Sequence, residues 1–299
     1  MTTLDALIAK IRAKNPSHAD KIEPITQALG TGFHKSANAF FEKYHSYLKR
    51  NNLSLDFSVD CYLHMIEDML EERFNFIRTG NYSNTSFDDV EQRVYGNSEI
   101  MKYHMHGLVL AQYLWFDQYE RIFFFTENIE RFIQNRNNYL EIGGGHGLYT
   151  LEALNIIPDI KQFDLVDISQ SSLDLAKGII DDPRINFYLK NIFDFTEEEK
   201  YDFITMGEVL EHVEQPLELL KKAGDLLRED GSFYLTTPIN APMIDHIYLF
   251  NNEEEIRTMI DQAGFKIELE KIVISEKVSA EKAAKNKAPL MYAAFLKKK

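Results

Sequence analysis

Apolar side chains recur at helical spacing through the first 136 residues. In four long segments, apolar residues lie three and four positions apart, which places them on one face of a helix. Glycine and asparagine clusters at residues 30–32 and 80–86 interrupt this pattern and predict loops. The pattern therefore predicts an all-helical N-terminal domain at residues 1–134, with helical segments within residues 4–14, 22–50, 59–80 and 98–125.

From Asn138 onward, short apolar runs alternate with helix-length segments, which is typical of a parallel α/β sheet. Two further strand-like runs follow each other without a helical pattern, and they indicate an antiparallel pair at one edge of the sheet. We therefore expect a Rossmann-like, seven-stranded, mostly parallel sheet with an antiparallel last strand, in a second domain at residues 135–299. The expected strands lie within residues 138–142, 163–168, 185–189, 202–206, 232–237, 264–275 and 288–297.

Composition narrows the class of protein. The chain has 299 residues, of which 44% are hydrophobic and 27% charged, enough for one or two ordinary cores. Its formal net charge of -14 disfavours long nucleic acid and anionic membrane surfaces as partners. Cys61 is the single cysteine, which excludes an intramolecular disulfide. The sequence shows neither a membrane-spanning apolar stretch nor a secretory signal, so we expect a cytoplasmic location.

The run EIGGGHG follows the first predicted strand and places glycine at residues 143, 145 and 147. A phosphate-binding Walker A loop needs a lysine, and this loop has none. The dinucleotide-binding fingerprint needs a third glycine where this chain has Leu148. A backbone with positive φ also requires glycine, so the loop alone does not identify a ligand.

Polar residues follow the second and third predicted strands. Asp167 lies near the end of the second strand, 20 residues beyond Gly147, where an acid can accept hydrogen bonds from both ribose hydroxyls of an adenosine. Asn191 and Ile192 follow the third strand, where a polar residue beside an apolar one could meet the adenine amine and stack on its ring. These positions are carboxyl ends of parallel strands, where open α/β sheets bind ligands.

With these motifs the chain resembles the class I S-adenosylmethionine-dependent methyltransferases over roughly residues 138–297. The resemblance rests on EIGGGHG, LVDIS, NIFDF, MGEVLEHVEQP and DGSFYLTTP in this order, followed by the closing antiparallel pair. One departure is Asn191, where many members carry Asp, although an amide oxygen still accepts from the adenine amine. The resemblance implies S-adenosyl-L-methionine as cofactor, with Glu141, Gly143 and Gly145 at its methionine and ribose, Asp167 at the ribose hydroxyls, Ile168, Asn191 and Ile192 at the adenine, and Met206 and Gly207 at the sulfonium.

The run MGEVLEHV follows the fourth predicted strand and is expected to open a helix. On a helix, Glu208, Glu211 and His212 share one face near the reactive end of the cofactor. His246 follows the fifth strand, in a loop that this fold places over the same opening. Two carboxylates and two imidazoles suit a divalent ion such as Mn²⁺, Fe²⁺, Co²⁺ or Zn²⁺ more than Mg²⁺. The pattern is similar to the metal site of small-RNA 3′-terminal 2′-O-methyltransferases, and EVLEHV is similar to the ubiquinone-pathway O-methyltransferases.

The same run is also compatible with an active site that binds no metal. Glutamates in the first turn of a helix are favoured by the helix dipole, and similar runs occur in methyltransferases for which no metal is expected. Without a metal, His212 or His246 is the best candidate general base, because imidazole titrates near neutral pH. Both histidines and Glu208 are therefore the candidate catalytic residues.

The helical half carries the candidate substrate residues. Tyr103, His106, Tyr113 and Trp115 lie in one aromatic-rich stretch just before the sheet region. Aromatic rings with polar tips suit a pocket for a small aromatic or polar-headed substrate. The same spacing is also typical of core packing or of a homodimer formed through the helical domain.

We therefore expect an S-adenosylmethionine-dependent methyltransferase that acts on a small molecule, at a hydroxyl oxygen, with or without metal assistance. Three alternatives remain: N-methylation with histidine as general base, 2′-O-methylation of an RNA 3′ terminus, and a non-catalytic protein that binds the cofactor. The net charge of -14 counts against RNA. The glycine spacing disfavours a nicotinamide-dependent oxidoreductase.

Overall fold

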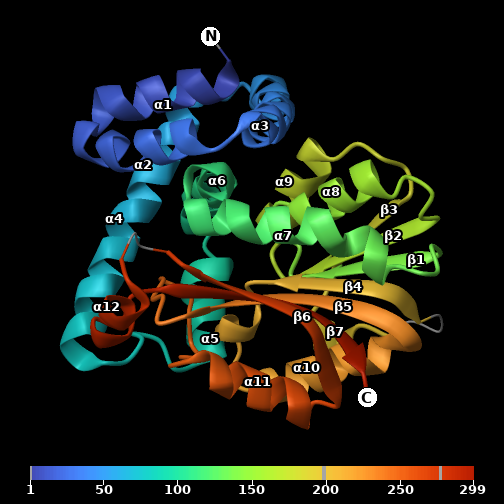
Figure 1. Cartoon of the computed structure of the whole chain (residues 1–299). Coiled ribbons are helices and arrows are strands. Elements are labelled where there is room, and N and C mark those ends of the chain that lie inside the picture. Colours follow the sequence, from blue (N-terminus) through green and yellow to red (C-terminus); the bar gives the residue numbers. More distant parts are fainter. Residues whose placement is uncertain (1, 197–199, 276–277) are drawn as a thin grey trace.

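The computed structural model of the chain describes residues 2–196, 200–275 and 278–299. Its N-terminal region is helical, as predicted (Figure 1). The long helix α4 runs from the layer of α1 to α3 down one side of the molecule. Within the described ranges, no helix has the length and apolar character needed to cross a membrane. The helices of this region are α1 (Thr3–Lys14), α2 (Pro16–Ala28), α3 (Thr31–Arg50), α4 (Leu55–Thr79), α5 (Phe87–Val90), the π-helical turn η1 (Glu91–Tyr95), α6 (Ser98–Leu114) and α7 (Phe116–Phe132).

Two of the predicted helical segments are divided. Residues 22–50 separate into α2 and α3 at the expected glycine cluster. Residues 98–125, expected as one helical stretch, separate into α6 and α7 at Trp115, whose backbone is extended with φ -101° and ψ 128°. The indole N–H of Trp115 donates to the hydroxyl of Tyr62 at 2.8 Å, which fixes this corner against α4. The break turns the chain so that α7 lies along the sheet (Figure 1).

The described strands form one seven-stranded sheet in the order β3-β2-β1-β4-β5-β7-β6. β7 pairs antiparallel with both β5 and β6, and the other pairs are parallel. The predicted mostly parallel sheet with an antiparallel last strand is confirmed. Its elements are β1 (Asn138–Ile142), α8 (Leu148–Ile156), β2 (Gln162–Asp167), α9 (Gln170–Ile179), β3 (Ile185–Leu189), the 3₁₀ turn η2 (Ile192–Asp194), β4 (Tyr201–Gly207), the 3₁₀ turn η3 (Leu210–His212), α10 (Pro216–Leu226), β5 (Leu227–Ile239), α11 (Glu253–Gln262), β6 (Phe265–Ile274), α12 (Ala280–Lys285) and β7 (Leu290–Lys298).

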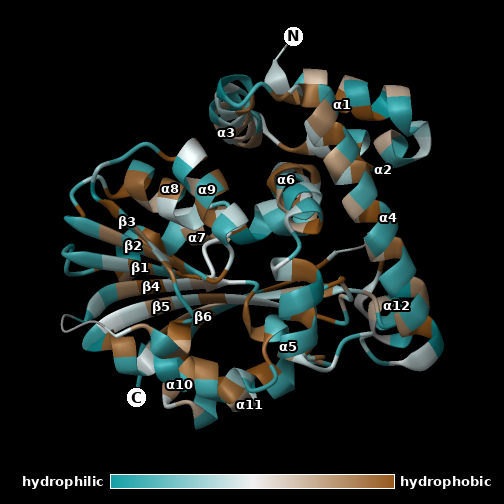
Figure 2. Ribbon diagram, turned by 180° about the vertical axis from the view of Figure 1, so that it is seen from behind, coloured by the Kyte–Doolittle hydropathy of each residue, from teal (hydrophilic) through white to brown (hydrophobic). Residues whose placement is uncertain are grey.

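Helices cover both faces of the sheet. α7, α8 and α9 lie on one face, and α10 and α11 on the other (Figure 1). Because successive strand residues point to opposite faces, Tyr139 enters the core beneath α7, whereas Leu140 and Ile142 enter the core beneath α10 and α11. Figure 2 shows hydrophobic residues along the middle of the sheet and hydrophilic residues mixed with them on the surrounding helices.

The helical half and the sheet share one of these cores. Buried residues from α1 to α7 belong to the same cluster as buried residues of β1, β4, β5 and β7. The contact is aromatic: the ring of Phe295 in β7 stacks on Phe132 of α7 at 4.4 Å between centroids and lies 4.7 Å from the ring of Tyr234. α7 thus belongs to the layers around the sheet, and a domain boundary between residues 134 and 135 stays a prediction.

A second connection positions the loop that follows β5. The side-chain amide of Asn84 donates to the carbonyl oxygens of Ile244 at 2.9 Å and His246 at 3.2 Å. The hydroxyl of Tyr82 accepts a hydrogen bond from the backbone N–H of Ala241 at 3.1 Å. The segment after α4 therefore holds the loop that carries His246.

The shared core predicts that both halves unfold together. We expect Phe295→Ala to lower the free energy of unfolding by about 3–5 kcal/mol, because it opens a cavity among buried rings. In urea titrations, the fluorescence of Trp115 in the helical half and the circular dichroism signal should shift by the same amount. Phe123→Ala, on the exposed side of α7, should change stability by less than about 0.5 kcal/mol. A Trp115 transition unaffected by Phe295→Ala would show that the helical half folds independently.

Candidate active site

A cavity of about 880 Å³ lies at the carboxyl ends of the strands. The order of the sheet reverses between β1 and β4, so the connections of these two strands diverge and leave a crevice there. The cavity is lined on the side of the sheet by the glycine loop, Asp167, Gly207 and His212. Residues of α2, α4, α6 and α7 and of the loop after β5 line much of the remainder. The cavity therefore joins the two halves of the chain.

The glycine loop after β1 fits the requirement for small residues. Gly143 and Gly145 have φ of 64° and 51°, in the left-handed region where a side chain is strained. A Cβ at Gly143 would lie 2.5 Å from Cγ2 of Val209, whereas the nearest atom to a Cβ at Gly145 is Cε of Met105 at 3.5 Å. The loop is therefore fixed by packing on one side and leaves its backbone close to the cavity on the other.

Two acidic residues flank this loop. Asp167 accepts the backbone N–H of Gly145 on Oδ2 at 2.9 Å and that of Ser169 on Oδ1 at 2.8 Å, and burial raises its pKa. Glu141 accepts the backbone N–H of Thr150 on Oε2 at 2.8 Å, and burial raises its pKa to about 7. Both carboxyl groups line the cavity.

The residues expected at the adenine also line the cavity. They are Ile168, Asn191 and Ile192, at the ends of β2 and β3. Oδ1 of Asn191 accepts the backbone N–H of Phe193 at 3.0 Å, so this amide caps the turn η2. Gly207 faces the cavity, but Met206 is fully buried in the core below the sheet and is not among the described residues that line the cavity.

The run from Glu208 to His212 is not an α-helix, and the expectation of one helical face is wrong. Glu208 has φ of 57°, and a 3₁₀ turn, η3, covers Leu210–His212. The carboxylate of Glu208 forms an ion pair with the buried guanidinium of Arg121 and accepts the hydroxyl of Thr236 at 2.9 Å. The left-handed backbone at Glu208 directs this side chain to α7, away from the position that a helix would give it.

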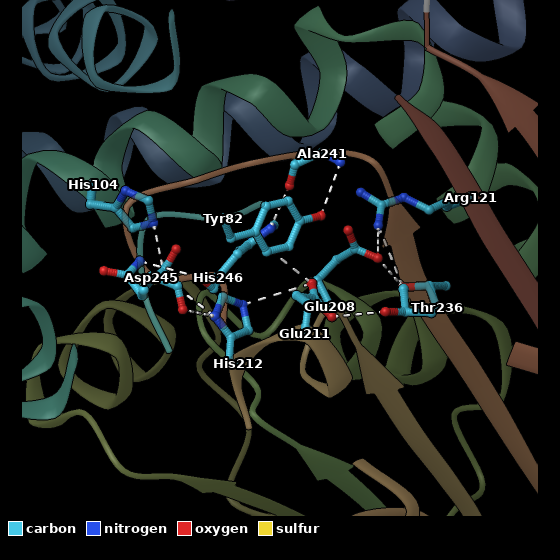
Figure 3. A network of polar contacts seen from close by, with 12 residues as sticks. Tyr82, His104, Arg121, Glu208, Glu211, His212, Thr236, Ala241, Asp245 and His246 are labelled. Atoms are coloured by element: carbon cyan, nitrogen blue, oxygen red, sulfur yellow. Dashed lines mark hydrogen bonds and ion pairs between the residues drawn. The ribbon is translucent and has the colours of Figure 1, made fainter. Parts of the chain in front are cut away.

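Glu211, His212 and His246 converge, as Figure 3 shows. Oε1 of Glu211 lies 3.7 Å from Nε2 of His212 and 4.0 Å from Nε2 of His246. One ligand atom from each of the three residues lies within 4.8 Å of the others, a spacing that could hold a metal ion. Glu208 is not part of this group within the described chain, so the structure brings three of the four predicted ligands together.

Hydrogen bonds orient both imidazoles toward Glu211. Nδ1 of His246 lies 2.6 Å from the carbonyl oxygen of Ala241, and Nδ1 of His212 lies 3.1 Å from that of Asp245. A carbonyl oxygen only accepts, so each Nδ1 carries a hydrogen, and each Nε2 has a lone pair when the imidazole is neutral. This arrangement of a backbone carbonyl behind each histidine is common around metal ligands.

The pKa values of two buried carboxyl groups at the cluster are shifted in opposite directions. Burial, followed by the charge of Glu208, raises the pKa of Glu211 to about 8. Burial also opposes ionisation of Asp245, yet the imidazoles around it lower its pKa to about 2. Oε1 of Glu211 has no hydrogen-bond partner among the described residues, although it is buried. A buried polar atom without a partner is costly, which makes this oxygen a candidate for binding a cation or a proton.

Three residues around this cluster were not among the predicted site residues. Oδ2 of Asp245 lies 3.6 Å from both Nε2 of His104 and Nδ1 of His212. The hydroxyl of Tyr95 lies 3.0 Å from Nδ1 of His212. Tyr95 and His104 come from the helical half, far from His212 in sequence, so only the folded chain brings them together.

The residues expected to contact the substrate do not lie together in the structure. Trp115 lines the cavity, whereas Tyr103, His106 and Tyr113 lie outside it among the residues that the structure describes. His106 contacts the hydroxyl of Tyr44 at 2.6 Å within the helical core, and Tyr113 packs against phenylalanines of α3. His104 faces the cavity instead. Counting back from Trp115 by 3, 7 and 11 residues gives the helix face that carries Gln112, Leu108 and His104, all of which line the cavity.

Comparison with known proteins gives a family and several partial relatives. A family model described as a methyltransferase domain matches residues 111–270. A malonyl-[acyl-carrier protein] O-methyltransferase from Ilyobacter polytropus is 28% identical over 116 residues, 38% of this chain and 43% of the relative. An alpha N-terminal protein methyltransferase from Dictyostelium discoideum is 32% identical over 142 residues, 44% of this chain and 52% of the relative. A mitochondrial ubiquinone biosynthesis O-methyltransferase from Candida albicans is 30% identical over 102 residues, 33% of this chain and 31% of the relative.

These matches identify the family of the chain but not its substrate. The chain spans about a third to a half of the length of the curated relatives that it matches. The family match covers more than half of the chain and extends from the end of α6 into β6, so it includes every strand end that lines the cofactor side of the cavity. The chain belongs to the methyltransferase domain family, as a class I S-adenosylmethionine-dependent methyltransferase.

Proposed function

We propose that this chain transfers a methyl group to a hydroxyl oxygen of a small-molecule acceptor, with a divalent metal ion held by Glu211, His212 and His246. The observation that carries the proposal is the buried Oε1 of Glu211, which has no hydrogen-bond partner among the described residues and faces Nε2 of two imidazoles. An alcohol or phenol is a weak nucleophile until it loses its proton. The site must therefore assist that loss.

The residues at the glycine loop fit the cofactor. Gly143 and Gly145 leave backbone exposed to the cavity, and the carboxylate oxygens of Asp167 keep lone pairs for the ribose hydroxyls after accepting two backbone N–H groups. Oε1 of Glu141 is not used by Thr150, so it is available for the positively charged amino group of the methionine part. Ile168 and Ile192 supply apolar surface for the adenine.

The cluster also fits a metal ion. Two imidazole nitrogens and one carboxylate oxygen suit Zn²⁺, Fe²⁺, Mn²⁺ or Co²⁺ better than Mg²⁺, which prefers oxygen ligands. Each histidine is held by a carbonyl oxygen on Nδ1, as metal-binding histidines usually are. When bound, such an ion lowers the pKa of a coordinated hydroxyl and holds its oxygen in place for methyl transfer.

The surrounding residues orient the cluster. Tyr95 and the backbone of Asp245 hold His212 from the side opposite Glu211, and the ion pair with Arg121 keeps Glu208 apart from the cluster. Glu211 and His246 are both buried, so little of either side chain contacts water. Placing the acceptor oxygen and the methyl group in line is then the main task of the cavity.

Methyl transfer to an amine is the second candidate. Acid-rich surroundings favour a cationic acceptor. Seven of the described residues that line the cavity are acidic, and Glu211 lies beside it; the seven are Asp117, Glu141, Asp167, Glu208, Glu214, Glu218 and Asp245. In that case His212 would take the proton from the amine. Chelators separate the two candidates, because amine methylation with a histidine base does not need the metal.

Glu141 gives a prediction about pH. Its pKa in the folded protein, about 7, exceeds the ordinary value of 4.5, so its protonated form stabilises the fold at low pH and this contribution is lost as pH rises through 7. Without cofactor, we therefore expect Glu141→Gln to raise the free energy of unfolding at pH 8 by up to about 3 kcal/mol. The same variant should bind S-adenosylmethionine at least about 10-fold more weakly, since it loses a charged acceptor.

Urea unfolding at pH 5 and pH 8, with calorimetry of cofactor binding, checks both parts. Glu152→Gln, on α8 and outside the cavity, is the matched control and should keep the affinity of the wild type. Unchanged cofactor affinity in Glu141→Gln would contradict the role proposed for this carboxylate.

The metal proposal predicts a specific pattern of losses. In calorimetry with S-adenosylhomocysteine present, we expect the wild type to bind Mn²⁺ at one site, and Glu211→Gln and His246→Ala to weaken it about 100-fold or more, because each removes a ligand. Glu208→Gln should bind Mn²⁺ within about threefold of the wild type, since Glu208 is held by Arg121. Cofactor affinity in each variant shows whether it is folded.

Activity on catechols tests the function itself. A chelator should abolish methyl transfer from S-adenosylmethionine to the catechol hydroxyl, and added Mn²⁺ should restore it. Equal, weak Mn²⁺ binding in the wild type and all three variants would refute the metal site. Amine methylation that persists in the chelator would instead support the second candidate.

A further inference from the structure

The cavity continues beyond the cofactor residues and the histidine cluster. Past Trp115, its lining includes Ile25 of α2, Met69 of α4 and Phe116 at the start of α7, together with Pro289 and Met291 beside the end of β6. These side chains are only partly covered by protein, apart from the buried Met291. We call this part of the cavity, away from the glycine loop, the apolar arm.

The lining of the cavity is rich in methionine, and Met69 and Met291 belong to the apolar arm. Met69, Met101, Met105, Met243 and Met291 line the cavity, five of the nine methionines in the chain. Leu108 and Trp115 lie on the same wall. Methionine side chains are unbranched and adjust to apolar groups of different shape, so this lining suits a flexible hydrocarbon better than one rigid ring.

Three polar side chains in the apolar arm contact other protein atoms, and Lys21 lies exposed at its outer end. The hydroxyl of Ser275 donates to Oδ2 of Asp117 at 2.6 Å. The side-chain amide of Gln112 donates to Oε1 of Gln118 at 3.3 Å. The guanidinium of Arg73 donates to the carbonyl oxygen of Asn240 at 3.2 Å. These contacts leave mainly apolar groups to meet a ligand in the apolar arm.

The apolar arm opens onto a row of exposed apolar residues. Leu70 lines the cavity and is 45% exposed. Phe74 and Ile77 follow it by four and seven positions on α4 and are 71% and 65% exposed. This spacing puts the three side chains on one face of the helix. The apolar lining therefore continues out of the cavity along α4.

We propose that the methyl acceptor carries a flexible apolar chain, which lies in the apolar arm and leaves it at Leu70 over Phe74 and Ile77. This inference rests on the proposed function, because it places the reacting hydroxyl at the cluster of Glu211, His212 and His246. The exposed row on α4 is thus assigned to the chain of the acceptor itself, since it is continuous with the cavity through Leu70.

Chain length is the variable to test. We would measure the affinity of catechols that carry a methyl, butyl or octyl chain para to one hydroxyl, by calorimetry with S-adenosylhomocysteine and Mn²⁺ present. Affinity should rise roughly fourfold for each methylene that the protein covers. Equal affinity for the methyl, butyl and octyl compounds would overturn the proposal.

Surface variants test the path over α4. The double variant Leu70→Ser and Phe74→Ser should weaken binding of the octyl compound about 10-fold and leave the methyl compound unchanged, because only the longer chain reaches this face. Phe123→Ser removes a similarly exposed aromatic residue from α7, outside the cavity, and should change neither. Wild-type affinity of the double variant for the octyl compound would overturn the path over α4.

Methyl transfer is measured separately, so the two proposals fail in different ways. Binding that depends on chain length without methylation of any catechol would support the apolar arm and refute oxygen as the acceptor atom. Methylation of all three catechols with equal affinity would support the proposed function and refute the apolar chain.

Discussion

The burial of Glu211 is the constraint on which the rest of the site depends. Its carbonyl oxygen accepts the backbone N–H groups of Ile247 at 2.7 Å and Tyr248 at 2.9 Å, so residue 211 fixes the loop that carries His246. Its Oε2 accepts the hydroxyl of Thr237 at 3.0 Å, which ties it to β5. Only Oε1 is left for the two imidazoles. A buried carboxylate is costly to ionise, and a cation or proton between Oε1 and the imidazoles offsets that cost.

Both the sheet and the helical half supply residues of the site. The strand ends supply the glycine loop and the acidic residues, and α6 with the segment after α4 supplies His104, Tyr95 and the contacts that hold the loop after β5. Because α7 shares a core with β5 and β7, the positions of these groups are fixed by the same packing that stabilises the sheet. Site geometry and fold stability are therefore coupled in this chain.

Hydrophobic periodicity was enough to predict the fold, because the central strands β1, β2 and β4 are buried on both faces and most helices on one face. The helix predicted from the same pattern at residues 208–212 does not form, because Glu208, directly after β4, has a left-handed backbone. Local spacing predicts which residues share a helix, but not which helix face meets the cavity, so it selected His106 instead of His104. Tyr95 lies 117 residues before His212, and no local pattern could join them. The prediction that Met206 lies at the sulfonium was wrong for a simpler reason. Neighbouring strand residues point to opposite faces, and Gly207, not Met206, lines the cavity.

The two ends of the cavity reach different parts of the surface. Lys190, Asn191 and Phe193 are exposed at the adenine end, beside β3, whereas Lys21 and Leu70 are exposed at the other end, on α2 and α4. In Figure 1, β3 and α4 lie on opposite sides of the molecule. A cofactor entering beside β3 and an acceptor entering beside α4 do not obstruct each other. In the proposed function, the methionine part and the acceptor meet beside the end of β4, which Glu208, Glu211 and His212 follow in the chain.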